Sequence, residues 1–195
     1  PVPEQCEQWP RGFYGFTKAA IERMGFYYKE TLGLDFRSIR LPIVISAYPS
    51  PGAASSYASN VFISAVRDGS YTLQVRETSN PALVYIEDCL KAIDLLTHAK
   101  RENMSRASYN LFSCAPSASE IVTELMKQLP DAQIRFETDN KIADLIDSWP
   151  KTIEDQAARE DWGWSPDFML EDMTKKFLAA LQEMNVKESN GGEEK

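Results

Sequence analysis

A helix-sized stretch followed by a buried strand is the feature that most constrains this fold. Residues 14–32 carry apolar side chains at helical spacing, and Gly33 follows them as a typical helix C-terminus. Residues 36–46 are rich in β-branched and apolar side chains, and the run at 41–45 is typical of a parallel strand covered on both faces. A helix that leads through a glycine turn into such a strand is half of a βαβ unit. We therefore expect an α/β fold, with the regular strand ending near Pro42 because proline cannot donate to a ladder.

The rest of the chain continues this alternation. We expect further helices at 57–67, 87–96, 117–129, 152–161 and 170–184, and strands at 71–75, 82–86, 107–112 and 133–137. Ser117 and Glu120 form a capping-box pattern, and Thr152 is a candidate cap for the helix at 152–161. We expect Trp162 and Trp164 to fill the core.

Composition argues against several classes of function. The 195 residues carry a net charge of −8, which disfavours nucleic acid or an anionic membrane as the main partner. No apolar run approaches the ~20 residues that a membrane span needs. Cys6, Cys89 and Cys114 are few and odd in number, which favours a reducing compartment over secretion. With His98 as the only histidine, we expect no metal site.

Tyr14 and Lys18 are the candidate catalytic residues. They are four positions apart at the start of the predicted helix and therefore lie on one helix face. A nearby cation favours a phenolate and so lowers the pKa of a tyrosine, which can then act as a general acid or base. The same spacing arises often by chance, so the neighbouring segments matter. The loop at 48–56 follows the carboxyl end of the predicted strand, where ligands bind in open α/β sheets.

These segments together resemble a known family. The run Tyr14-Gly15-Phe16-Thr17-Lys18, the pair at 27–28 and the segment 33–42 are similar to the extended short-chain dehydrogenase/reductases. The segments 147–150 and 158–164 and the loop 51–58 narrow the resemblance to the short-chain type of L-threonine 3-dehydrogenase, within the NAD-dependent epimerase/dehydratase superfamily. The resemblance covers residues 11–183.

The resemblance implies a fold, a reaction and a set of site residues. The fold is the C-terminal part of a Rossmann-like doubly wound parallel sheet with a small mixed α/β substrate lobe, over residues 1–187, followed by a disordered tail at 188–195. The reaction is the NAD-dependent oxidation of L-threonine to 2-amino-3-oxobutanoate. The implied general base is Tyr14, and Lys18 tunes it and holds the nicotinamide ribose. The implied neighbours of the nicotinamide are Pro42, Ile43 and Val44, and those of the amino acid are Ala54, Ser55, Ser56 and Tyr57.

The sequence departs from the family pattern at three places. It contains no glycine-rich fingerprint for a dinucleotide pyrophosphate. The Ser or Thr that the family places upstream of the tyrosine lies further back than the residues before Tyr14. The family's Tyr-Pro-Gly and Thr-Thr-Asp read as Leu-Pro-Ile at 41–43 and Ala-Ser-Ser at 54–56. We therefore expect a chain without its NAD-binding half, which neither binds NAD usefully nor is active alone.

Two further expectations concern partners and alternatives. Apolar surface on residues 14–32 and 36–45 should be left uncovered, which favours pairing. The resemblance implies a small-molecule substrate such as L-threonine, a homodimer when the protein is complete, and a mitochondrial or, alternatively, cytoplasmic location. Two other interpretations stay open: a non-catalytic product of a truncated gene, and a related nucleotide-sugar epimerase or dehydratase.

Overall fold

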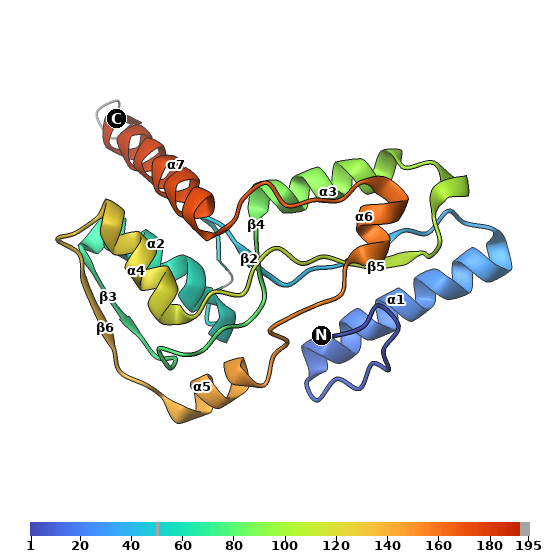
Figure 1. Ribbon diagram of the computed structural model, residues 1–195, viewed down its shortest axis with the longest axis horizontal. Helices are drawn as coiled ribbons and strands as arrows, with labels where there is room; N and C mark the ends of the chain where they lie inside the picture. The colour runs from blue at the N-terminus through green and yellow to red at the C-terminus, as the bar shows by residue number, and fades with distance from the viewer. Residues whose placement is uncertain (50, 192–195) are drawn as a thin grey trace.

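Helices and short parallel strands alternate along the chain in a computed structural model that describes residues 1–49 and 51–191 (Figure 1). The helices are α1 (Phe13–Leu32), α2 (Tyr57–Asp68), α3 (Ile86–His98), α4 (Ala118–Gln128), α5 (Asn140–Asp147), α6 (Gln156–Trp162) and α7 (Leu170–Gly191). The strands are β1 (Ser38–Arg40), β2 (Ile43–Ile45), β3 (Ser70–Leu73), β4 (Leu83–Tyr85), β5 (Ser108–Asn110) and β6 (Gln133–Phe136). Two 3-10 helices, η1 (Ala54–Ser56) and η2 (Arg101–Asn103), lie between them. The α/β prediction is confirmed.

The strands pair in parallel, and each pair joins segments far apart in sequence. β1 pairs with β5, β2 with β4, and β3 with β6. The strand predicted at 36–46 is thus two strands with different partners. Pro42 interrupts it, as expected from its missing N–H, but Ile43 donates to the carbonyl of Ala82 at 3.1 Å and pairing resumes. The break turns the chain at the place where a cavity opens.

Two apolar cores flank these strands. One includes Phe62, Leu125 and Phe177, where α2, α4 and α7 meet beside β3 and β6. The other surrounds α3, β5 and α6 and includes Trp162 and Trp164, which are 8% and 2% exposed. The expectation that both tryptophans fill the core is confirmed.

Three local expectations change in the structure. Thr152 does not cap a helix, because a bridge between Val2 and Ile153 holds this segment extended, and α6 begins only after Asp155. Helix α5 was not expected; the Asp139 side chain caps it by accepting from the N–H groups of residues 141 and 142. Helix α7 extends to Gly191 and so includes the first residues of the expected tail 188–195, while residues 192–195 lie outside the described residues.

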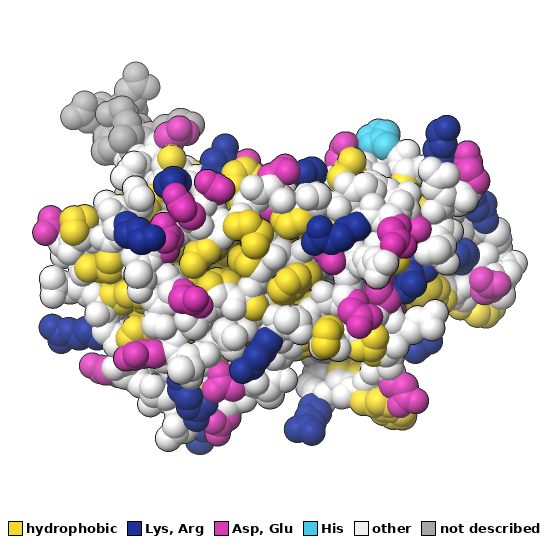
Figure 2. Space-filling view, viewed as in Figure 1, with side chains coloured by type: hydrophobic (Ala, Val, Ile, Leu, Met, Phe, Trp, Pro, Cys, Tyr) yellow, Lys and Arg dark blue, Asp and Glu magenta, His cyan; other side chains and the backbone are white. Residues whose placement is uncertain are grey.

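Helix α1 buries a different face from the expected one. Ile21, Met24 and Tyr28 do not pack against the sheet; they are 60%, 54% and 40% exposed. The buried positions are Glu22 and Gly25. The expectation of uncovered apolar surface on this helix is therefore confirmed. Figure 2 shows that acidic and basic side chains are interspersed around the apolar groups on the visible face of the molecule.

Gly25 permits the close approach of α1 to the segment before β1. A Cβ atom at this position would lie 2.1 Å from the Phe36 ring, which itself packs edge-on against Phe26. Alanine normally stabilises a helix interior by up to about 1 kcal/mol over glycine. Here we expect Gly25→Ala to destabilise the fold by about 1 to 3 kcal/mol, because overpacking outweighs helix propensity.

Urea unfolding of Gly25→Ala measures this effect. The same substitution in a Phe36→Leu background is the control, and its cost should be smaller because the ring is gone. An unchanged or higher midpoint for Gly25→Ala alone contradicts the expectation.

No helix among the described residues is both long enough and apolar enough to cross a membrane.

Candidate functional site

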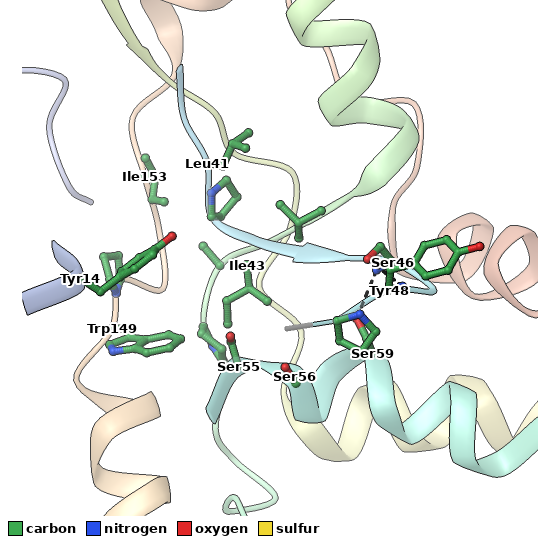
Figure 3. Close-up of a pocket in the computed structure, with 16 residues that line it drawn as sticks. Tyr14, Leu41, Ile43, Ser46, Tyr48, Ser55, Ser56, Ser59, Trp149 and Ile153 are labelled. Carbon is green, nitrogen blue, oxygen red and sulfur yellow. Dashed lines mark hydrogen bonds between the residues drawn. The ribbon is translucent and has the colours of Figure 1, made fainter. Parts of the chain in front are cut away.

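A cavity of about 580 Å³ lies where β2 ends (Figure 3). Several segments that are distant in sequence converge on it. Its lining consists of Tyr14, Leu41, Pro42, Ile43, Val44, Ser46, Tyr48, Pro49, Ser55, Ser56, Ser59, Pro81, Ala82, Trp149, Pro150 and Ile153. The cavity is therefore a meeting point of the first helix, the broken strand, the following loop and the connection between α5 and α6.

Backbone geometry fixes the end of the cavity away from α1. The N–H of Ser46 donates to the Ser59 hydroxyl at 3.2 Å, which joins the end of β2 to α2. The N–H of Tyr48 donates to the Ser46 hydroxyl at 3.3 Å. These bonds hold the loop after β2 beside the helix that follows it. The loop position expected from the sequence is thus confirmed.

Tyr14 enters the cavity from the start of α1. The Lys18 ammonium lies 5.2 Å from the centroid of the Tyr14 ring, so the two residues share a helix face as their spacing predicts. Tyr14 is 76% exposed. Lys18 lines a neighbouring cavity of about 780 Å³, which shares Trp149 and Pro150 with the first. The catalytic roles of Tyr14 and Lys18 stay predictions.

The structure brings together most, but not all, of the predicted site residues. Those that line the cavity with Tyr14 are Pro42, Ile43, Val44, Ser55 and Ser56. Ala54 packs against the apolar core instead of lining the cavity.

Tyr57 was predicted to contact the substrate, but it does not line the cavity. It is 5% exposed and belongs to the core of α2, α4 and α7. Burial, with a contribution from Asp147, raises the pKa of the Tyr57 phenol. The geometry therefore favours Ser55 and Ser56 over Ala54 and Tyr57 as the residues that face a ligand.

Trp149, Ser46 and Ser59 line the cavity but were not predicted as site residues. The segment 147–150 is part of the family resemblance, which implied no role for Trp149 in the site. Its place beside Tyr14 depends on the packing of α5, which the sequence pattern did not reveal. No sequence pattern marked Ser59 as a site residue, because serines are common on the polar face of an amphipathic helix.

An ion-pair cluster anchors the segment that carries Trp149. Arg76, in the loop after β3, pairs with Asp144 at 2.5 Å and with Asp147 at 2.6 Å. Burial raises the pKa of Asp147, but the Ser79 hydroxyl and the Arg76 guanidinium more than offset this and hold it below its ordinary value. The carboxylate is thereby kept charged near neutral pH. The end of α5 is fixed by charged contacts outside the cavity wall.

A second cluster anchors α1. Glu22, 8% exposed, receives two hydrogen bonds from Arg40, at 2.5 and 2.9 Å, and one from Gln8 at 3.0 Å. Arg40 also donates to the Glu4 carbonyl at 3.1 Å. Burial raises the pKa of Glu22, but Arg40, with smaller contributions from Gln8 and Ser108, more than offsets this, and the pKa lies below its ordinary value. Helix, strand β1 and N-terminal segment are joined at this point.

The described residues contain no cluster of three or more side chains suited to a metal ion. Cys6, Cys89 and Cys114 are free thiols. Burial raises the pKa of Cys89 to about 12 and that of Cys114 to about 11, so both stay protonated near neutral pH.

Comparison with known proteins identifies a family that the chain matches. A model of the NAD dependent epimerase/dehydratase family matches residues 2–111. The mitochondrial L-threonine 3-dehydrogenase of Bos taurus is 36% identical over 179 residues, which cover 91% of this chain and 48% of that protein. An uncharacterized epimerase/dehydratase of Staphylococcus haemolyticus is 33% identical, over 93% of this chain and 58% of its own length. The chain spans about half the length of the curated relatives it matches.

Solved structures with a similar fold include L-threonine dehydrogenases. The L-threonine dehydrogenase of Phytophthora infestans superposes with a TM-score of 0.85 at 34% identity, over 94% of this chain and 61% of that one. The holo form of a GalE-like L-threonine dehydrogenase from Cupriavidus necator has a TM-score of 0.85 at 32% identity, over 92% and 58% of the two chains. The α/β fold with short parallel strands thus matches part of the Rossmann-type threonine dehydrogenases.

Proposed function

The chain belongs to the NAD dependent epimerase/dehydratase family, and from this premise we propose that its cavity serves the oxidation of L-threonine to 2-amino-3-oxobutanoate. The observation that carries the proposal is Tyr14 at the cavity wall with the Lys18 ammonium one helical turn behind its ring. The similarity to several L-threonine dehydrogenases supports the choice of substrate.

Tyr14, Lys18 and the two serines of η1 each have a chemical task in this proposal. Tyr14 accepts the proton of the substrate hydroxyl, which allows the carbonyl to form at Cβ of threonine. Lys18 stabilises negative charge that develops on the phenol, since a cation beside it favours the phenolate. Ser55 and Ser56 offer hydroxyl donors and acceptors to the amino acid.

The residues present fit the nicotinamide end of NAD. The Tyr14 hydroxyl and, from the neighbouring cavity, the Lys18 ammonium suit ribose hydroxyls. Residues 42–44 form an apolar wall for a planar ring. NAD, when bound, accepts the hydride that leaves Cβ of threonine. We further propose that β1 and β2 belong to a doubly wound nucleotide-binding sheet that α1 covers. In this proposal α2, α4, β3 and β6 form the substrate lobe.

Three properties of the whole protein are proposed with it. A homodimer would cover the apolar face of α1, where Phe13, Phe16 and Leu32 are 82%, 60% and 71% exposed. A mitochondrial location is supported by the name of the Bos taurus relative. The substrate is a small hydroxylated amino acid.

NADH formation from L-threonine and NAD tests the proposal. It is measured on this chain and on any longer native product that contains it, with D-threonine and L-serine as comparison substrates. Formation of NADH and 2-amino-3-oxobutanoate in equal amounts is expected from the longer product. It is not expected from this chain alone, which has no glycine-rich fingerprint for the pyrophosphate of NAD. A protein that converts a nucleotide sugar without net NADH, and leaves L-threonine untouched, would instead be an epimerase, the activity class suggested by the staphylococcal relatives.

A further inference from the structure

We propose that Trp149 determines substrate specificity by holding a cationic ammonium group against the face of its indole ring. The inference rests on the proposed function, because it takes the cavity beside Tyr14 as the substrate site. It goes further in naming the side chain that recognises the amino group, for which the described lining offers no carboxylate.

The described cavity lining offers no negative charge to the ammonium group of an amino-acid substrate. Every described side chain on the cavity wall is neutral, whereas an amino-acid substrate brings a positive ammonium group. Neutral groups can stabilise a cation through hydroxyl oxygens or through the electron-rich face of an aromatic ring. Among aromatic side chains, tryptophan has the strongest such attraction. The wall therefore recognises a cation through rings and hydroxyls.

The position of Trp149 suits this task. In Figure 3 the indole extends into the cavity toward Ser55, and the Tyr14 ring lies above it. An ammonium group in this space lies between a ring face and a hydroxyl oxygen. The secondary alcohol of the same ligand can then reach the Tyr14 phenol.

The segment that carries the indole is also held in place before any ligand arrives. The backbone N–H of Trp149 donates to the carbonyl of Ile146 at 3.0 Å, and the backbone N–H of Ala82 donates to the carbonyl of Pro150 at 2.9 Å. The ion pairs of Arg76 fix the end of α5 directly before this segment. The ring packs partly against the larger core. A wall fixed from both sides loses little conformational entropy when a ligand binds.

Two matched probes isolate the ammonium group. Both 1-amino-2-propanol and 3-hydroxybutyrate carry the secondary alcohol and methyl group of threonine, but only the first has a cation. Calorimetry measures their affinities and that of L-threonine for the full chain without NAD. Trp149→Leu removes the ring, Trp149→Phe keeps a weaker one, and Trp9→Leu is a control that removes an exposed indole outside this cavity.

We expect Trp149→Leu to lower the affinity for 1-amino-2-propanol by about 5- to 30-fold, because the cation–π contact is lost. Binding of 3-hydroxybutyrate should stay nearly constant, Trp149→Phe should lie between, and Trp9→Leu should match the wild type. The ratio of the two affinities does not depend on the folded fraction, since both probes see the same protein. An equal loss for both probes overturns the inference.

Fluorinated tryptophan provides a second test that preserves the side-chain shape. Incorporation of 5-fluorotryptophan weakens the ring's attraction for cations and should reduce only the binding of the cationic probe. If L-threonine fails to bind while 1-amino-2-propanol binds in a Trp149-dependent way, the inference holds and the proposed substrate is wrong. If L-threonine binds equally well to wild type and Trp149→Leu, the inference is wrong and the proposed function stands.

Discussion

Tyr14→Phe is expected to lower kcat for L-threonine oxidation by about 100- to 10,000-fold, the usual contribution of a positioned general base. The substitution removes one oxygen atom at a side chain that is 76% exposed, so the fold should not change. The ring beside the Lys18 ammonium also remains. The effect should therefore fall on kcat, while KM changes little. Initial rates of NADH formation measure it in a longer native product that contains this chain, because the chain alone is expected to be inactive.

Tyr27→Phe is the matched control for this prediction. Tyr27 lies on the same helix and is 62% exposed, but it lines neither cavity beside Tyr14. The control should keep the wild-type rate. If Tyr14→Phe keeps most of the activity, another group removes the proton and the proposed role of Tyr14 is wrong.

Glu22→Gln is expected to destabilise the fold by about 3 kcal/mol, because it leaves the partly buried Arg40 guanidinium without its carboxylate partner. Glu22 joins α1 to β1 through the paired hydrogen bonds of Arg40. Its loss should also lower activity by loosening the helix that carries Tyr14. Urea unfolding measures the stability, and kcat measures the positioning.

Two variants separate the ion pair from other effects. Glu30→Gln changes an exposed carboxylate on the same helix and should cost less than about 0.5 kcal/mol. The double variant Glu22→Leu with Arg40→Met removes both charges and should be more stable than Glu22→Gln alone, since no unpaired charge remains buried. A double variant that is less stable than Glu22→Gln contradicts this account.

The same ion pair predicts an acid-sensitive fold. The pKa of Glu22 in the folded state lies below its ordinary value near 4.5, so the folded chain binds this proton less readily than the unfolded chain. Its contribution to stability is thus fully present above pH 4.5 and is lost as the pH falls through the folded-state pKa. Unfolding midpoints measured from pH 7 downward should fall less steeply in Glu22→Gln than in the wild type.

Local sequence signals determined much of this molecule. Gly33 ends α1 with a positive φ of 67°, because only a residue without Cβ adopts that geometry at no cost. The Ser117–Glu120 capping box forms as its spacing predicts. The place of Tyr14 one turn before Lys18 followed from helical periodicity alone. Each depends on contacts between residues a few positions apart, which a sequence pattern encodes directly.

The composition of the cavity depended on the tertiary structure. Trp149 lies 135 positions beyond Tyr14, and long-range contacts, including the ion pairs of Arg76 and the bond between Ala82 and Pro150, bring it to the same wall. Tyr57 belongs to the loop that the sequence assigned to the substrate, yet α4 and α7 draw it into the core. The apolar stripe of α1 faces outward while Glu22 is buried, since Arg40 offers a partner that no periodicity reveals. The sequence thus determined most of the elements and the common helix face of Tyr14 and Lys18, whereas long-range packing decided which other side chains line the cavity.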